Sequence, residues 1–155
     1  MPGIVPGEVA VLNLFTPGGI TLSTGVMVIY ADEESFTFMT PEGHIFSGWI
    51  TFSAFQSDEC TIAQAQILMR PNDLLYELGF RLGGSKAEGA FWIQTLESLA
   101  EHHGVKGQVQ MTSTCVDPRL QWSQAKTIWH NAAIRSTFYS VFALARWIRK
   151  AVTRH

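Results

Sequence analysis

The chain has 155 residues, of which 46% are hydrophobic and 15% are charged, so it is long enough for one domain with a buried core. No uncharged apolar run approaches the roughly 20 residues of a membrane-spanning helix, and we expect no signal peptide in residues 1–7. All 13 acidic residues lie at or before Asp117, whereas every charged residue from Arg119 onward is basic. We therefore expect an acidic body with a basic C-terminal segment in a cytoplasmic protein, with a peripheral position on the inner face of a membrane as an alternative.

The first half of the chain predicts strands joined by short turns. Alternating apolar and polar residues between Gly, Pro and Asp clusters predict strands over residues 8–15, 20–31, 35–40, 45–55 and 59–69. Gly48 inside the fourth strand is typical of a bulge or bend that curls a sheet. Short connections favour an antiparallel meander, with residues 108–115 as a candidate sixth strand.

A long helix over residues 85–103 is the expected partner of this sheet. Ser85 and Glu88 match a capping box at its start, and Gly104 supplies the left-handed residue that ends many helices. One side of this helix is apolar at helical spacing, including Trp92 and Leu96. That stripe should lie on the concave face of the sheet.

Two further helical regions complete the pattern. One covers residues 74–82, and the other runs from about residue 121 to residue 153 with an interruption near His130. Strands first and helices after indicate the α+β class. We expect a curled antiparallel meander of five to six strands that grips one long helix, with extra C-terminal helices.

The stretch from Thr40 to Phe52, followed by residues 70–82 and the long helix, resembles the START-like, or helix-grip, superfamily, which includes polyketide cyclases. Related bacterial sequences carry a similar Gly-His turn leading into such a strand. The resemblance covers roughly residues 5–104, and the N-terminal strand and helices of the usual fold are not found before the meander. It suggests a START-like sheet-plus-helix domain over residues 1–116 and a basic helical extension over residues 117–155.

The resemblance implies a pocket for an apolar or amphipathic small molecule, such as a lipid, a pigment or a polyketide-like compound, between sheet and helix. The residues expected to line it are Phe46, Ile50, Phe52, Ala63, Ala65, Trp92 and Leu96. The small side chains on the fifth strand would leave volume beneath the tryptophan. The alternative is that the aromatic side chains fill this space as an ordinary core.

Candidates for catalysis are few. Glu42 and His44 share a turn and are weak candidates for an acid–base pair, although such residues are common in surface turns. The sequence carries no phosphate-binding loop, dinucleotide fingerprint, nucleophile motif or metal-ligand spacing. We expect a non-enzymatic protein with no cofactor and no metal, and a cyclase- or hydrolase-like enzyme is the alternative. Cys60 and Cys115 are expected to be reduced and buried.

The last helix has an apolar stripe at alternating four- and three-residue spacing beside a basic sector. The residues expected to dock it to a membrane or a protein partner are Arg135, Arg146, Trp147, Arg149 and Lys150. Three interpretations remain open: packing on the domain or in a homodimer, binding to an anionic membrane, or binding to a larger complex. An accessory or structural subunit without a ligand is therefore the alternative function. Nucleic acid is the least favoured partner because the body is acidic.

Overall fold

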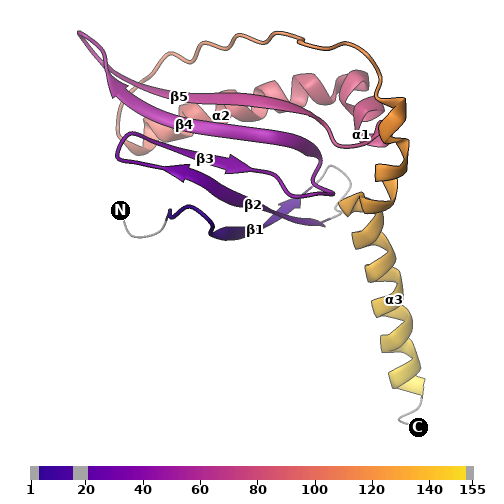
Figure 1. Ribbon diagram of the computed structural model, residues 1–155. Helices are drawn as coiled ribbons and strands as arrows, with labels where there is room; N and C mark the ends of the chain where they lie inside the picture. The colour runs from indigo at the N-terminus through magenta and orange to yellow at the C-terminus, as the bar shows by residue number, and fades with distance from the viewer. Residues whose placement is uncertain (1–3, 16–20, 153–155) are drawn as a thin grey trace.

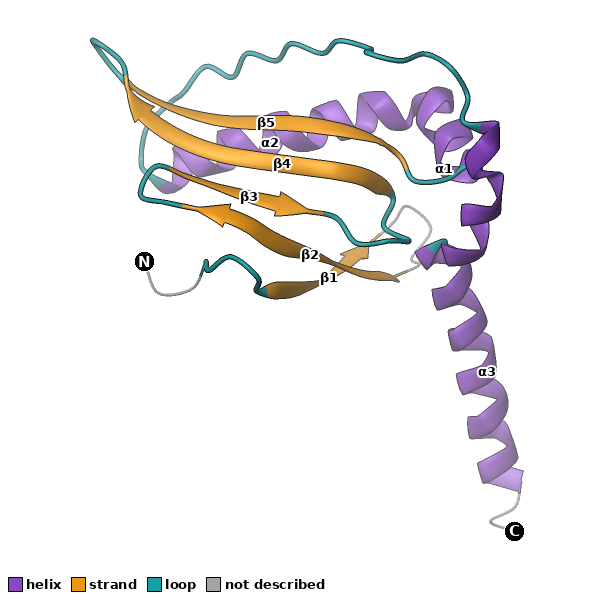
Figure 2. Ribbon diagram, in the orientation of Figure 1, coloured by secondary structure: helices purple, strands orange, loops and turns teal. Residues whose placement is uncertain are grey.

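The computed structural model describes residues 4–15 and 21–152 and confirms the α+β class (Figures 1 and 2). The strands are β1 (Val9–Phe15), β2 (Thr21–Ala31), β3 (Ser35–Met39), β4 (Phe46–Gln56) and β5 (Thr61–Pro71). The helices are α1 (Leu74–Gly79), η1 (Phe80–Gly84), α2 (Ser85–His102), η2 (Trp122–His130) and α3 (Ala132–Val152). The predicted strand start at Ile20 and helix end at Thr153 lie outside the described residues.

The sheet is the predicted antiparallel meander. Its strands follow one another in the order β1-β2-β3-β4-β5, and α2 lies across the face that is turned away from the viewer in Figure 1. Trp92 of α2 contacts Phe52 of β4, with ring centroids 6.0 Å apart. We call this the helix-side face and the opposite one the outer face. Among the described residues no helix is both long and apolar enough to span a bilayer.

Among the described residues, the large apolar side chains that are almost fully buried lie in a small part of the helix-side face. Leu22 and Val28 of β2 are 1% and 5% exposed. They lie on the strand that α3 contacts. The aromatic residues further along this face, Phe36, Phe38 and Phe52, are only half-buried. The interface between sheet and α2 is therefore incompletely covered.

Gly48 has a different role from the one expected of it. The pairing of β4 with β5 is regular at Gly48, and the register shift of the sheet lies in β2, between Val28 and Tyr30. The bulge predicted at Gly48 is therefore wrong. Gly48 is instead required for close approach, because its φ is +154° and a Cβ atom there would lie 2.1 Å from the carbonyl oxygen of Leu68.

The long helix begins differently from the prediction and ends as predicted. The chain is already helical at Gly84, so Ser85 is an interior position without a side-chain capping bond, and the predicted capping box is wrong. At the other end, Gly104 has a φ of +71°. Its N–H donates to the carbonyl of Glu101 and the N–H of Val105 donates to that of Ala100, the paired bonds that close a helix.

The predicted sixth strand is also wrong. Residues 107–115 form no strand, and they run as an extended segment along α2. Met111 of this segment packs against Gly89, where a Cβ atom would lie 3.3 Å from its methyl carbon. Both cysteines are exposed, Cys60 in the turn before β5 and Cys115 in the extended segment, so the expected buried thiols are not found.

Candidate functional site

The structure brings together part of the predicted ligand pocket. Phe52 and Trp92 contact each other, whereas Phe46 packs against Phe80 of η1 with centroids 5.5 Å apart. Ile50, Ala65 and Leu96 are half-buried, and Ala63 is exposed. Phe46 and Ala54, the partner of Ala63, are eight residues apart on one strand, which separates them by roughly 26 Å. These positions therefore cannot line one small pocket together.

Phe52 and Trp92, which were predicted to line the pocket, form an aromatic cluster with Phe36 and Phe38, which were not. Phe36 stacks on Phe52 with centroids 5.1 Å apart, and Phe38 meets Phe36 at 5.2 Å. The indole N–H of Trp92 donates a hydrogen bond to the Glu88 carboxylate. Burial raises the pKa of Glu88, and that hydrogen bond opposes the shift. The cluster thus presents an apolar surface with one polar group at its margin.

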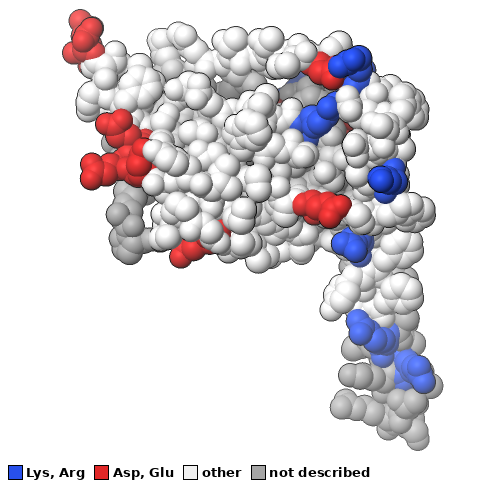
Figure 3. Space-filling view, in the orientation of Figure 1, with Lys and Arg blue, Asp and Glu red and all other residues white. Residues whose placement is uncertain are grey.

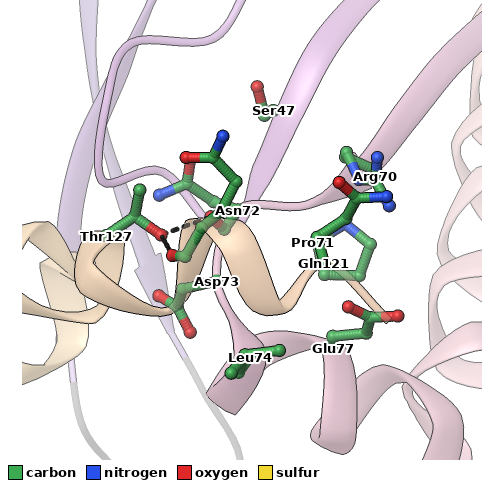
Figure 4. A pocket seen from close by; sticks show the side chains of 10 residues that line it. Ser47, Arg70, Pro71, Asn72, Asp73, Leu74, Glu77, Gln121 and Thr127 are labelled. Carbon is green, nitrogen blue, oxygen red and sulfur yellow. Dashed lines mark hydrogen bonds between the residues drawn. The ribbon is translucent and has the colours of Figure 1, made fainter. Parts of the chain in front are cut away.

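A polar pocket of about 290 Å³ lies at the opposite end of the sheet from the β4–β5 turn (Figure 4). Three segments surround it: the ends of β4 and β5, the start of α1, and η2. Its lining residues are Ser47, Arg70, Pro71, Asn72, Asp73, Leu74, Glu77, Gln121, Gln124 and Thr127. Sequence reasoning did not find this pocket, since η2 is about fifty residues away from α1 along the chain.

One buried hydrogen-bond donor in this pocket lacks a partner within the described part of the chain, while the other polar groups at its centre are paired. Gln121, with its side-chain oxygen toward Arg70, accepts bonds of 3.2 Å from both terminal guanidinium nitrogens. Glu77 forms an ion pair with Arg81, in which a guanidinium nitrogen lies 2.8 Å from a carboxylate oxygen. The buried amide nitrogen of Asn72 has no partner among the described residues. Because a buried unpaired donor costs roughly 1–3 kcal/mol, the pocket suits a small polar molecule that offers an acceptor oxygen.

Two helix caps join beside the pocket. The Asp73 carboxylate accepts from the backbone N–H groups of Leu75 and Tyr76 and so caps α1. The Asn131 side-chain oxygen accepts from the N–H groups of the second and third residues of α3. Asn131 also donates to Asp73 at 2.7 Å, and the two residues are 0% and 4% exposed. This double cap fixes the start of α3 to the start of α1. The predicted interruption near His130 is found at Asn131, between η2 and α3.

The structure gives Glu42 and His44 separate partners. Glu42 forms an ion pair with His130 at the end of η2. The Nδ1 atom of His44 lies 3.1 Å from the backbone nitrogen of Phe46. Burial lowers the pKa of His44, which favours the neutral ring. No hydrogen bond between Glu42 and His44 is found in the described part of the chain, so the geometry gives no support to an acid–base pair.

The predicted docking helix carries both aromatic and cationic side chains. Phe138, Tyr139 and Phe142 are exposed on α3, which extends away from the sheet (Figure 1). Arg146 lies over the Tyr139 ring, 5.8 Å from its centroid, and both border a surface hollow with Phe142 and Arg149. Arg135 is exposed nearer the body. The side chains of Trp147 and Lys150 lie outside the described part of the structure.

Comparison with known proteins finds no matching family model, no matching curated protein and no matching solved structure. Within residues 4–15 and 21–152, no group of three or more His, Cys, Asp or Glu side chains is placed to hold a metal ion. The described residues thus present three surfaces: the aromatic cluster, the polar pocket, and the aromatic and cationic side chains of α3.

Proposed function

We propose that the protein is a non-enzymatic, START-like binding domain for an apolar or amphipathic small molecule. The molecule binds at the aromatic cluster between the sheet and α2. The observation that carries this proposal is the half-burial of Phe36, Phe38, Phe52 and Trp92 at the place where a sheet and a helix ordinarily seal a core. Covering their exposed area would gain roughly 25 cal/mol per Å².

The surroundings of the cluster favour an amphipathic ligand. Glu88 lies beside Trp92 and is the polar group at the margin of the apolar surface. A ligand with an apolar body and a hydrogen-bonding end would place its body on the rings and its polar end near this carboxyl group. Such a combination of apolar lining and few polar groups is typical of small-molecule sites.

A fluorescent fatty acid titrated into the purified protein tests this proposal. Trp92→Leu is expected to raise its Kd at least about tenfold, because the variant removes ring area from the cluster. Trp129→Leu is the matched control, since Trp129 is an exposed tryptophan on η2, away from both faces of the sheet. Native mass spectrometry of the wild type should also reveal a co-purified apolar compound. Absent binding, or an equal loss in both variants, would contradict the proposal.

A second candidate function is an accessory subunit that docks through α3 on an anionic membrane. Exposed Phe138 and Phe142 together with Arg146 favour this role, because aromatic and cationic side chains suit the boundary between headgroups and acyl chains. The segment from Arg119 onward contains no acidic residue that would oppose such binding.

Sedimentation with vesicles of phosphatidylcholine, with and without phosphatidylglycerol, tests this second function. Arg135→Gln combined with Arg146→Gln is expected to weaken binding to anionic vesicles about 30-fold, since each cation near the surface contributes about 1 kcal/mol. Lys86→Gln combined with Lys106→Gln removes the same charge from the body and should change little. Equal effects of the two pairs, or equal binding to neutral vesicles, would argue against docking through α3.

A further inference from the structure

One row of large apolar side chains crosses the outer face of the sheet. The strand register makes Val9 the partner of Met27, Met27 the partner of Met39, Met39 the partner of Trp49, and Trp49 the partner of Leu68. These five residues, the outer ridge, therefore stand side by side on five neighbouring strands over about 19 Å. Trp49 and Leu68 are 48% and 47% exposed.

The ridge lies on the face that α2 does not cover. Trp49 is three residues before Phe52, the β4 residue that contacts α2, so the two side chains point to opposite faces. Next to the ridge, Thr37 and Thr51 share a hydrogen bond of 2.9 Å. The remaining outer-face positions of β4 and β5 are Ser, Thr, Gln, Phe and Ile residues, with Arg70 at one end. A contiguous apolar patch whose surround carries few charged side chains is typical of a protein interface.

We infer that the outer ridge is the interface between two copies of this chain, packed sheet against sheet. Arg70 is the only charged side chain at the outer-face positions of the described strands, so this face meets its own copy with little like-charge repulsion, as an isologous two-fold interface requires. The chain exposes 12141 Å². A compact monomer of 17.2 kDa would expose roughly 7,800 Å². The excess of roughly 4,300 Å² per chain is larger than the roughly 1,000–2,500 Å² that each partner of a homodimer buries, and α3 accounts for part of it.

The charges at the two ends of the sheet fix the orientation of the copies. Carboxylates gather at the β2–β3 and β4–β5 turns, on the left in Figure 3, whereas most cations lie along α3 and at the other end of the sheet, where some carboxylates also lie. Asp32 at the β2–β3 turn accepts hydrogen bonds from Tyr30, Glu34 and Ser35, which lower its pKa to about 2 and keep it ionised. A two-fold axis along the ridge reverses the strand direction, so it brings the acidic end of each copy toward the cationic end of the other.

Sedimentation velocity of the full chain over a range of concentrations tests this dimer. The wild type is expected to dimerise, and Leu68→Glu is expected to raise the dimer Kd at least about 100-fold by burying an unpaired charge. Leu82→Glu is the matched control, because Leu82 is an exposed leucine on η1, away from the ridge. Salt at about 1 M should weaken the dimer, since the Debye length falls to about 3 Å.

A gentler variant keeps the test valid if Leu68→Glu does not fold. Leu68→Gln adds a third glutamine to the two already on this face of β5, Gln64 and Gln66. It is expected to raise the Kd of the dimer about tenfold. A wild type that stays monomeric at about 100 μM, or a dimer that both Leu68 variants leave intact, would overturn the interface. A dimer that salt does not weaken would overturn the proposed orientation.

Discussion

Asn131→Ala is expected to lower the free energy of unfolding by about 2–5 kcal/mol, because it leaves one oxygen of the buried Asp73 carboxylate without a partner and removes the cap of α3. Asn131 is fully buried, and its amide donates to Asp73 at 2.7 Å while its oxygen accepts from two backbone N–H groups of α3. Urea denaturation followed by circular dichroism measures the loss.

A double-mutant cycle measures the energy of the hydrogen bond between Asn131 and Asp73 separately from the energy of each helix cap. Asp73→Ala is expected to cost a similar amount, and the double variant should cost at least about 1.5 kcal/mol less than the sum of the two. Asp117→Ala is the control: the Asp117 carboxylate also accepts from a backbone N–H, that of Arg119, but it does so near the surface. It should cost less than about 1 kcal/mol. Additive losses at Asp73 and Asn131 would show that the two caps act independently.

The sequence predicted those parts of the fold that depend on local pattern. Each of the first five predicted strands was found within about two residues of its observed bounds where both ends are described, and the long helix ended at Gly104 as expected. The capping box failed because tertiary structure overrides a local motif: α1, η1 and α2 follow one another through a kink at Gly83, so Ser85 never occupies a cap position. Residues 108–115 have the composition of a strand but pack on α2 instead.

The sites depend on contacts that no local pattern reveals. Asp73 and Asn131 are 58 residues apart, and each alone is recognisable only as an ordinary helix cap. The outer ridge similarly requires the register of four strand pairs, because Met27, Met39 and Leu68 are unremarkable in their own segments. Ala63 lies on β5 as predicted. It is too far along that strand from the end near Phe46 for the two residues to line the same pocket.

Gly43→Ala is expected to release the C-terminal segment from the sheet. Gly43 has a φ of +87°, and a Cβ atom there would lie 2.2 Å from the carbonyl oxygen of His130. Its own carbonyl accepts the N–H of Ala132 at 3.0 Å, so the turn before β4 and the start of α3 cannot separate without losing that bond. We expect a loss of about 3 kcal/mol or more, since backbone atoms on both sides must move.

Gly104→Ala is the control for Gly43→Ala. It measures the cost of the backbone conformation without the steric crowding found at Gly43. Gly104 has a similar φ of +71°, but a Cβ atom there would meet nothing within 4 Å, so only the left-handed strain of about 1 kcal/mol remains. Hydrogen exchange locates the effect: in Gly43→Ala, exchange should accelerate in η2 and the first turns of α3, while β4 and β5 stay protected. If the two variants lose equal stability, or if exchange in Gly43→Ala rises first in the sheet, then contact with Gly43 does not hold the basic segment against the body.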